Sequence, residues 1–262
     1  MNDALIGFSG FVGGTLMKQT SFTHLYRSTN IGDIRDRSFD TVVCAGAPAQ
    51  KWIANRDPLG DLNKIAELIS YLETIKCERF ILISTVDVFK CPVDVDEDTI
   101  VDVDGLHAYG KNRRILEEFV ERHFPNSLIV RLPGLVGPGL KKNVIFDFLN
   151  DNNIRSVDSR GLFQFYPMVN LWSDIKVALD FKLKLVHLSA QPISVEEVSE
   201  LAFGKHFVNL VVDLPAIYDV QTKYAELFNG AGRYQYSKRE TVQAIRAYAQ
   251  SELPTLSSGG RT

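Results

Sequence analysis

Short apolar runs alternate with amphipathic stretches along most of this chain, and that alternation limits the folds open to it. Six runs have the length and composition of buried strands, at residues 4–7, 23–27, 41–45, 80–85, 128–132 and 185–188. Helical patterns separate several of them, at residues 59–76, 109–123 and 171–181. Strands that alternate with helices form parallel sheets with both faces covered. With right-handed crossovers, the sequence predicts an α/β fold with a doubly wound parallel sheet.

Two of the helical stretches carry an apolar stripe on one face. The stripe of 59–76 follows Pro58 at the helix start, and that of 109–123 includes Leu116, Phe119 and Val120. Two explanations fit these stripes equally well. They pack on the sheet of their own subunit, or they build the helix bundle of a homodimer.

The character of the chain changes after about Gly134. Glycines and a proline interrupt regular structure, and an aromatic stretch over 163–166 looks irregular. Two Ser-x-x-Glu capping boxes, at Ser194 and Ser237, then predict helix starts. We therefore expect a main domain over 1–134 plus about 168–190, and a smaller lobe over 135–167 and 191–262. Residues 257–260 read as a mobile tail.

The composition excludes several classes of function. Of 262 residues, 45% are hydrophobic and 23% charged, which is ordinary for a soluble globular protein. A net charge of −3 gives no reason to expect a nucleic acid or an anionic membrane as partner. No apolar run reaches the roughly 18 residues of a membrane span, and the first strand leaves no room for a signal peptide. Three cysteines without metal-like spacing fit a cytoplasmic protein with no metal site.

A Gly-x-x-Gly-x-x-Gly run follows the first strand directly. It comprises Gly7, Ser9, Gly10, Phe11, Val12 and Gly13 with Phe8 between, and leads into a helical pattern. Glycine permits the tight turn, lets the backbone approach a pyrophosphate and allows close packing of helix on strand. The helix N-terminus then favours the anion. A simple turn is the alternative, but the strand–helix context favours binding of a dinucleotide.

The end of the second strand bears on which dinucleotide binds. An acidic residue there would take the ribose hydroxyls of NAD, whereas this chain has Arg27 and Ser28. A cation with neighbouring hydroxyls suits the 2′-phosphate of NADP, so we favour NADP over NAD. A solvated surface arginine is the alternative. Asp33 and Ile34 are candidates to line the adenine, and the small residues Ala45, Gly46 and Ala47 would let a cofactor pass closely.

A hydroxyl, a phenol and a cation are candidates for the chemistry. Ser84 and Thr85 end a buried strand, at the edge where open α/β sheets bind ligands. Tyr109 opens the following helix, and Arg113 lies one turn further on the same face. A phenol is a poor base unless a cation favours the phenolate. Each residue alone has a structural explanation: Thr85 as a hydrogen bonder at the strand end, Tyr109 as a packing residue and Arg113 as a solvated charge. Together the three favour proton transfer to or from a carbonyl.

With these motifs the chain resembles the extended short-chain dehydrogenase/reductases, the NAD-dependent epimerase/dehydratase family of sugar-nucleotide enzymes. The resemblance rests on the glycine run, on Ser84-Thr85 followed by Val88-Phe89, and on Tyr109-Gly110-Lys111-Asn112-Arg113. Further echoes are the segments 131–139, 171–175 and 187–195, so it covers nearly the whole chain. It implies a Rossmann-type domain with a small C-terminal substrate lobe.

The resemblance also implies roles for individual residues. Tyr109 would be the acid/base, Thr85 would hydrogen-bond the substrate, and Ser84 and Pro133 would lie beside the cofactor. The family lysine that holds the nicotinamide ribose and lowers the tyrosine pKa corresponds to Arg113, which keeps the charge but differs in shape. Thr85 is not followed by the adjacent carboxylates of family dehydratases, so dehydration is not expected.

The resemblance implies a nucleotide sugar as substrate. Residues 134–142 with Gln164, Tyr166 and Asn170 would rim the cleft between the lobes. Lys141, Lys142 and Arg160 are candidates to meet a diphosphate, with a solvated surface as the alternative. We expect an NAD(P)-dependent oxidoreductase, most simply a reductase; an NAD-dependent epimerase and a non-catalytic dinucleotide-binding sensor or scaffold are the alternatives.

Overall fold

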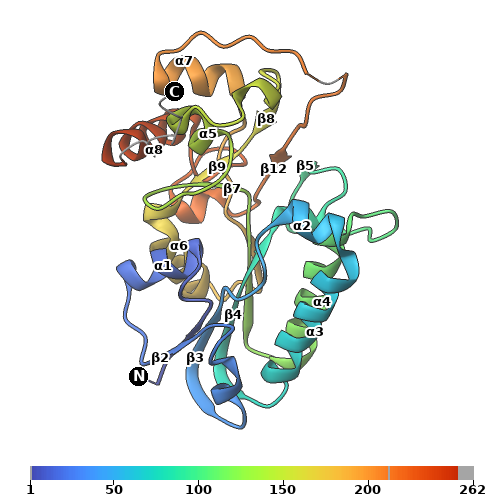
Figure 1. Cartoon of the computed structure of the whole chain (residues 1–262). Helices are drawn as coiled ribbons and strands as arrows, with labels where there is room; N and C mark the ends of the chain where they lie inside the picture. The colour runs from blue at the N-terminus through green and yellow to red at the C-terminus, as the bar shows by residue number, and fades with distance from the viewer. Residues whose placement is uncertain (1, 212, 253–262) are drawn as a thin grey trace, which may run out of the picture.

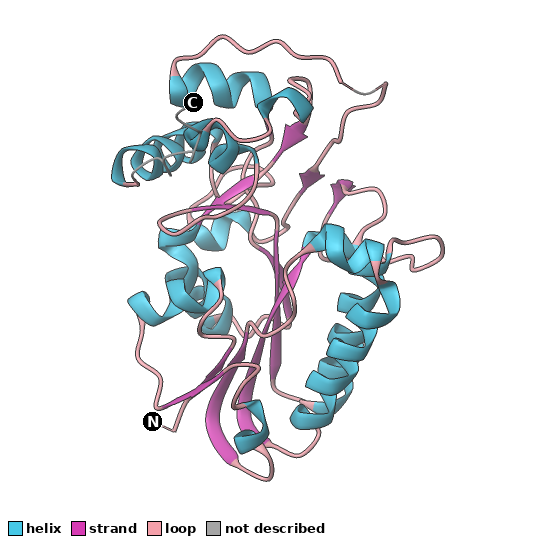
Figure 2. Ribbon diagram, in the orientation of Figure 1, coloured by secondary structure: helices cyan, strands magenta, loops and turns pink. Residues whose placement is uncertain are grey.

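A six-stranded parallel sheet forms the centre of the protein in a computed structural model that describes residues 2–211 and 213–252. Its strands are β1 (Ala4–Ile6), β2 (His24–Tyr26), β3 (Ser38–Cys44), β4 (Lys76–Thr85), β6 (Ser127–Leu132) and β10 (Leu185–His187). Their order in the sheet is β2-β1-β3-β4-β6-β10. Figures 1 and 2 show the sheet at the centre of the molecule. The chain moves outward from β1 to β2 and then returns to the other side with β3. This reversal opens a crevice at the carboxyl ends of β1 and β3, the edge where ligands bind in such folds.

Helices cover both faces of the sheet, as Figure 1 shows. On one face lie α3 (Pro58–Leu72) and α4 (Ala108–His123), and on the other lie α1 (Phe11–Gln19) and α6 (Leu171–Asp180). Successive residues of a strand point to opposite faces. Phe80 and Leu82 accordingly pack with α3 and α4, whereas Ile81 and Ile83 pack with α1 and α6. The predicted doubly wound parallel sheet is confirmed.

The predicted strands all exist, and the differences lie at their ends. The helix predicted over 59–76 is too long at its C-terminal end. In the structure α3 ends at Leu72, and the chain turns through Thr74 and Ile75 into β4. The strand β4 begins at Lys76, earlier than predicted, because its first residues are mostly polar and exposed and carry no apolar signal. Between β2 and β3 the crossover holds only the short 3-10 helix η1 (Ile31–Ile34).

The apolar stripes of α3 and α4 pack on the sheet of the same chain. Ile65 and Leu72 of α3, and Leu116, Phe119 and Val120 of α4, belong to one buried cluster with the strands. Packing within one subunit therefore accounts for both stripes, and the homodimer stays a prediction. No helix within the described ranges is both long and apolar enough to cross a bilayer.

The second half of the chain adds a smaller group of elements above the sheet edge. Its helices are α5 (Val144–Asn150), α7 (Val195–Phe203) and α8 (Lys238–Ser251), which share a buried cluster with β7 (Gly134–Val136) and β9 (Phe165–Pro167). The remaining elements are α2 (Lys51–Arg56), β5 (Val93–Val95), β8 (Leu162–Phe163), β11 (Ile193–Ser194), β12 (Asp219–Val220), and the 3-10 helices η2 (Val86–Val88), η3 (Ile154–Ser156), η4 (Met168–Asn170) and η5 (Ala225–Phe228).

Two expectations for this half have a clear outcome. Both capping boxes are present, because Ser194 with Glu197 caps α7 and Ser237 with Glu240 caps α8. The aromatic stretch over 163–166 is not irregular as predicted, since it contributes to β8 and β9. The domain boundaries stay predictions, and the tail predicted at 257–260 lies outside the described residues.

Candidate functional site

The glycine run forms a tight turn between β1 and α1. Gly7 has a φ of +87°, and a Cβ atom there would lie 2.3 Å from the carbonyl oxygen of Ala45. A Cβ atom on Gly13 would lie 2.2 Å from the carbonyl oxygen of Gly7, so α1 packs on the turn at a distance that only glycine permits. Gly10 is the N-cap residue of α1, with no side-chain cap. The loop thus leaves the N-terminus of α1 uncovered by any capping side chain, with Ser9 and Gly10 exposed and Phe11 and Val12 partly buried.

The residues after β2 lie at the surface beside this loop. Arg27 and Ser28 are exposed, and the Arg27 guanidinium lies over the Phe8 ring, 5.8 Å from its centroid. Its Nε donates to the Thr29 hydroxyl at 2.9 Å. Arg27 therefore has a defined position near the glycine turn while its charge stays open to solvent.

The two residues predicted to line an adenine differ in exposure. Asp33 is exposed, whereas Ile34 is fully buried in the core beneath the sheet and presents no surface to a ligand. The side chain of Ile34 packs the short crossover between β2 and β3 against the core. On the other side of the crevice, Ala45, Gly46 and Ala47 directly follow β3 and are partly buried.

The phenol of Tyr109 and the hydroxyl of Thr85 meet at the carboxyl edge of β4. Thr85 ends β4, and its Oγ accepts a hydrogen bond from the Asp87 N–H at 3.1 Å. Burial raises the pKa of Tyr109, and Asp87 raises it further, against the lowering influence of Arg113, Lys51 and a hydrogen bond with Thr85. Tyr109 is therefore a protonated phenol at neutral pH, able to donate a proton.

Arg113 is buried and paired, which rules out the solvated charge as its explanation. Its guanidinium forms a two-point ion pair with Asp61 of α3, with Nη2 3.0 Å from Oδ1 and Nη1 against Oδ2. Nη2 also donates to the carbonyl oxygen of Pro48, and the Arg113 Cζ lies 4.0 Å from the Tyr109 ring centroid. The Arg113 Nε has no hydrogen-bond partner among the described residues. The charge thus sits against the phenol ring and is held there from two sides.

A second polar cluster, which no sequence motif predicts, adjoins Tyr109. Lys51 at the start of α2 binds Asp87, with Nζ 2.7 Å from Oδ1, and its Nζ also donates to the Tyr218 hydroxyl at 3.1 Å. The Tyr218 hydroxyl donates to the same Asp87 oxygen at 2.9 Å. These residues are far apart in the chain, so only the fold brings them together. Lys51 keeps 38% of its side chain exposed.

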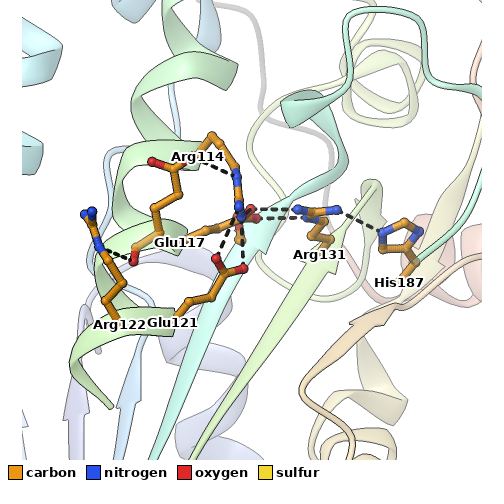
Figure 3. A network of polar contacts seen from close by, with 8 residues as sticks. Arg114, Glu117, Glu121, Arg122, Arg131 and His187 are labelled. Carbon is orange, nitrogen blue, oxygen red and sulfur yellow. Dashed lines mark hydrogen bonds and ion pairs between the residues drawn. The ribbon is translucent and has the colours of Figure 1, made fainter. Parts of the chain in front are cut away.

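Ser84 does not face the same way as Thr85. Its hydroxyl donates to Glu117 Oε1 of α4 at 2.6 Å, within a buried network drawn in Figure 3. Glu117 binds Arg131 of β6 at two points, 3.0 and 2.7 Å. Burial is the largest influence and would raise the Glu117 pKa, but Arg131, Ser84 and Arg114 together outweigh it and the pKa is lowered. Ser84, predicted beside a cofactor, therefore has a structural role in joining β4 to α4.

The network continues from Arg131 to His187 of β10 (Figure 3). The Arg131 Nη1 lies 3.3 Å from His187 Nε2, and His187 Nδ1 lies 3.0 Å from the carbonyl oxygen of Gln221. Because an arginine only donates, Nε2 accepts and Nδ1 carries the proton. Burial lowers the pKa of His187, in agreement with a neutral ring.

Several residues predicted to rim a substrate cleft are buried instead. Gln164 bonds the backbone of Ala190 and Val220, and the Tyr166 hydroxyl donates to Asp174 at 2.5 Å. Both side chains are almost inaccessible, so they hold the lobe together and are not available to a substrate. Their polar groups suggested an exposed position, but each forms its hydrogen bonds inside the protein.

The predicted basic residues have mixed positions. Lys141 is exposed, and Arg160 pairs with Asp158 in the same loop at 2.8 Å. Lys142 reaches across to the loop before α2, where its Nζ donates to the carbonyl oxygen of Ala49. Gly134 and Asn170 stay partly or wholly exposed, and Pro133 follows β6 at the sheet edge.

Solved structures with similar folds have the same overall arrangement as this chain. RMD from Pseudomonas aeruginosa complexed with NADPH has a TM-score of 0.73 at 19% identity, over 96% of this chain and 99% of that one. A dTDP-4-dehydrorhamnose reductase from Clostridium acetobutylicum has a TM-score of 0.71 at 17% identity, over 95% and 99%. A UDP-glucose 4-epimerase from Thermotoga maritima with UDP-glucose has a TM-score of 0.68 at 15% identity, over 95% and 99%.

At these identities the likeness establishes the fold. The resemblance to the extended short-chain dehydrogenase/reductases is therefore confirmed for the fold, with the chain spanning nearly the full length of these structures. No protein-family model and no curated protein matches the sequence.

Proposed function

We propose that this protein is an NADP-dependent reductase that acts on a nucleotide-linked keto sugar. The observation that carries the proposal is the meeting of Tyr109 and Thr85 at the carboxyl edge of the sheet that also carries the glycine turn. Two of the similar folds belong to a reductase of a dTDP-sugar and to a protein in complex with NADPH. Their activities are not those of this chain, but they identify the first ligands to test.

The residues fit a dinucleotide. The close contact of Gly13 with the Gly7 carbonyl oxygen holds the N-terminus of α1 against the glycine turn, and no side chain caps that end of the helix. A pyrophosphate would bind there, with its charge favoured by the helix dipole. Arg27 and Ser28 would hold the 2′-phosphate that distinguishes NADP. The unpartnered Nε of Arg113 is a donor for which a ribose hydroxyl is a suitable acceptor.

The protonated phenol of Tyr109 is the form that a reductase uses. A reductase must give a proton to the oxygen of the substrate, and the raised pKa of Tyr109 keeps that proton on the phenol. The bound nicotinamide would supply the hydride. Thr85 would hydrogen-bond the substrate oxygen and fix it beside the phenol. Arg113, fixed by Asp61, would stabilise the phenolate that remains.

Binding and turnover test this proposal separately. Thermal unfolding should shift upward with NADPH more than with NADH at equal concentration, because a ligand that binds only the folded state stabilises it. NADPH should then be oxidised in the presence of dTDP-4-dehydrorhamnose. Tyr109→Phe should lower kcat on the order of a hundredfold while NADPH binding persists. Tyr71→Phe, on α3, should leave both unchanged.

Each outcome separates the candidate functions. Binding of NADPH without turnover of any nucleotide sugar, and with no effect of Tyr109→Phe, would support a dinucleotide-binding sensor. An epimerase is the second candidate, because the UDP-glucose 4-epimerase fold covers nearly all of this chain. NAD that co-purifies with the protein, together with conversion of UDP-glucose, would favour it over the reductase.

A further inference from the structure

A buried carboxylate on α3 pairs with the cation that contacts Tyr109. We propose that Asp61 is a positioning residue, which opposes the charge of the Arg113 guanidinium and thereby keeps Tyr109 a proton donor. The proposal rests on the reductase function above and adds a residue of α3 to the site. It gives Asp61 an effect on the phenol that an ion pair with a structural role alone would not have.

The Arg113 guanidinium contacts both the phenol ring and the carboxylate. Its Cζ lies 4.0 Å from the centroid of the Tyr109 ring, within the range of a cation–π contact. Its two terminal nitrogens bind the two oxygens of Asp61, with 3.0 Å between Nη2 and Oδ1. A cation this close to a phenol favours the phenolate. The Asp61 carboxylate acts in the opposite direction, so the pair favours the phenolate far less than an unpaired arginine would.

The pair is fixed in place and shielded from water. The side chains of Arg113 and Asp61 are 3% and 5% exposed. Asn112 holds the carboxylate from α4, because its Nδ2 donates to Asp61 Oδ2 at 2.8 Å, and the carbonyl oxygen of Pro48 holds Arg113 Nη2. Charges in such a place interact more strongly than charges in water. The loss of the Asp61 charge would therefore act on Tyr109 with little screening.

The other charged and titratable groups around Tyr109 and Arg113 do not replace Asp61. They are Lys51, Asp87, His107, Lys142 and Tyr218. Lys51 and Asp87 pair at 2.7 Å and act on the phenol in opposite directions. Burial lowers the pKa of His107, so its ring is neutral at neutral pH. Within the described ranges, Asp61 is the carboxylate with which Arg113 forms an ion pair.

Titration of Tyr109 tests the proposal without any turnover. The ultraviolet absorbance of tyrosinate is recorded against pH for each protein and for its Tyr109→Phe counterpart, and the difference reports Tyr109 alone. Asp61→Asn leaves the guanidinium unopposed, so we expect the Tyr109 midpoint to move down by about one pH unit or more. Arg113→Met leaves the carboxylate unopposed and should move the midpoint up. The double variant removes both charges and should return it close to the wild-type value.

The pH dependence of turnover gives a second readout. With NADPH and dTDP-4-dehydrorhamnose, the alkaline limb of kcat/KM should move down in Asp61→Asn, because the rate falls as the phenol loses its proton. If Asp61 were only structural, the variant would lose the same fraction of the rate at every pH and the limb would stay in place. Glu118→Gln is the matched control, since Glu118 pairs with Arg114 on α4 but is 46% exposed, and it should leave the midpoint unchanged.

The possible outcomes are distinct. An Asp61→Asn midpoint at or above that of wild type overturns the proposal. Where circular dichroism shows that a single variant unfolds before Tyr109 titrates, the double variant decides. Its midpoint well above that of wild type would mean that Arg113 acts as a net cation, which also overturns the proposal. Wild-type protein that oxidises no NADPH refutes the reductase function, whereas the titration still decides whether Asp61 acts on Tyr109.

Discussion

The ion pair between Asp61 and Arg113 gives the sharpest test of how this site is built. Their side chains are only 5% and 3% exposed, so neither charge is shielded by water. Asp61→Asn keeps the shape of the side chain but leaves the guanidinium buried without a counter-charge. Removing one partner of such a pair costs about 3–5 kcal/mol. For a chain of this size, that corresponds to a fall in Tm of roughly 6–20 °C.

Thermal unfolding followed by circular dichroism measures this effect. Asp98→Asn is the matched control, because Asp98 also pairs with a lysine, Lys223, but is 73% exposed. A pair of that kind contributes about 0–1 kcal/mol. The double variant Asp61→Asn, Arg113→Met should recover much of the lost stability, because it leaves no uncompensated charge. If Asp61→Asn costs no more than Asp98→Asn, the pair does not hold the site together and the reasoning fails.

Three further predictions address cofactor choice, the glycine turn and pH. Arg27→Ala should weaken NADPH binding about tenfold or more and leave NADH binding nearly unchanged; equal losses in titrations with both would contradict a 2′-phosphate contact. Gly13→Ala should abolish dinucleotide binding, since its Cβ would lie 2.2 Å from a carbonyl oxygen, whereas Gly14→Ala, with 3.8 Å to its nearest neighbour, should retain it in the same titrations. Because burial lowers the pKa of His187 in the folded protein, the unfolded chain takes up a proton at this residue at a higher pH than the folded chain does. The free energy of unfolding should therefore fall as the pH drops below about 6.5, by at most about 1.4 kcal/mol per pH unit. Urea unfolding should show a smaller acid loss for His187→Gln and the full loss for His206→Gln, whose side chain is 78% exposed.

The sheet and its main helices could be predicted because their signals are local. A buried parallel strand reads as an apolar run, and a helix that packs on it reads as a stripe, whatever the rest of the chain does. The capping boxes at Ser194 and Ser237 are equally local, and both are confirmed. The errors lie where polar residues continue a strand, as at Lys76, or where a buried aromatic segment looks irregular.

The contacts of the candidate site could not be predicted in the same way. Asp61 lies 52 residues before Arg113, and Tyr218 lies 131 residues after Asp87, so no spacing in the sequence relates them. Burial of a charge is also invisible locally, since a helix pattern does not reveal which charged residue meets a partner across a helix pair. Arg113 could be recognised as a candidate, but its partner and the neighbouring Lys51 emerge only from the folded arrangement.

The short crossover between β2 and β3 has a consequence for how this protein could change. Most of η1 and its flanks is solvent-facing; Ile31 and Ile34 are its buried residues, and the Asn30 side chain bonds the backbone of Leu25 and Arg27. Substitutions or insertions among the other residues would therefore remodel the wall next to Arg27 without disturbing the interior. Changes of a few surface side chains there could alter whether the protein prefers a phosphorylated or an unphosphorylated ribose, while the fold stays the same.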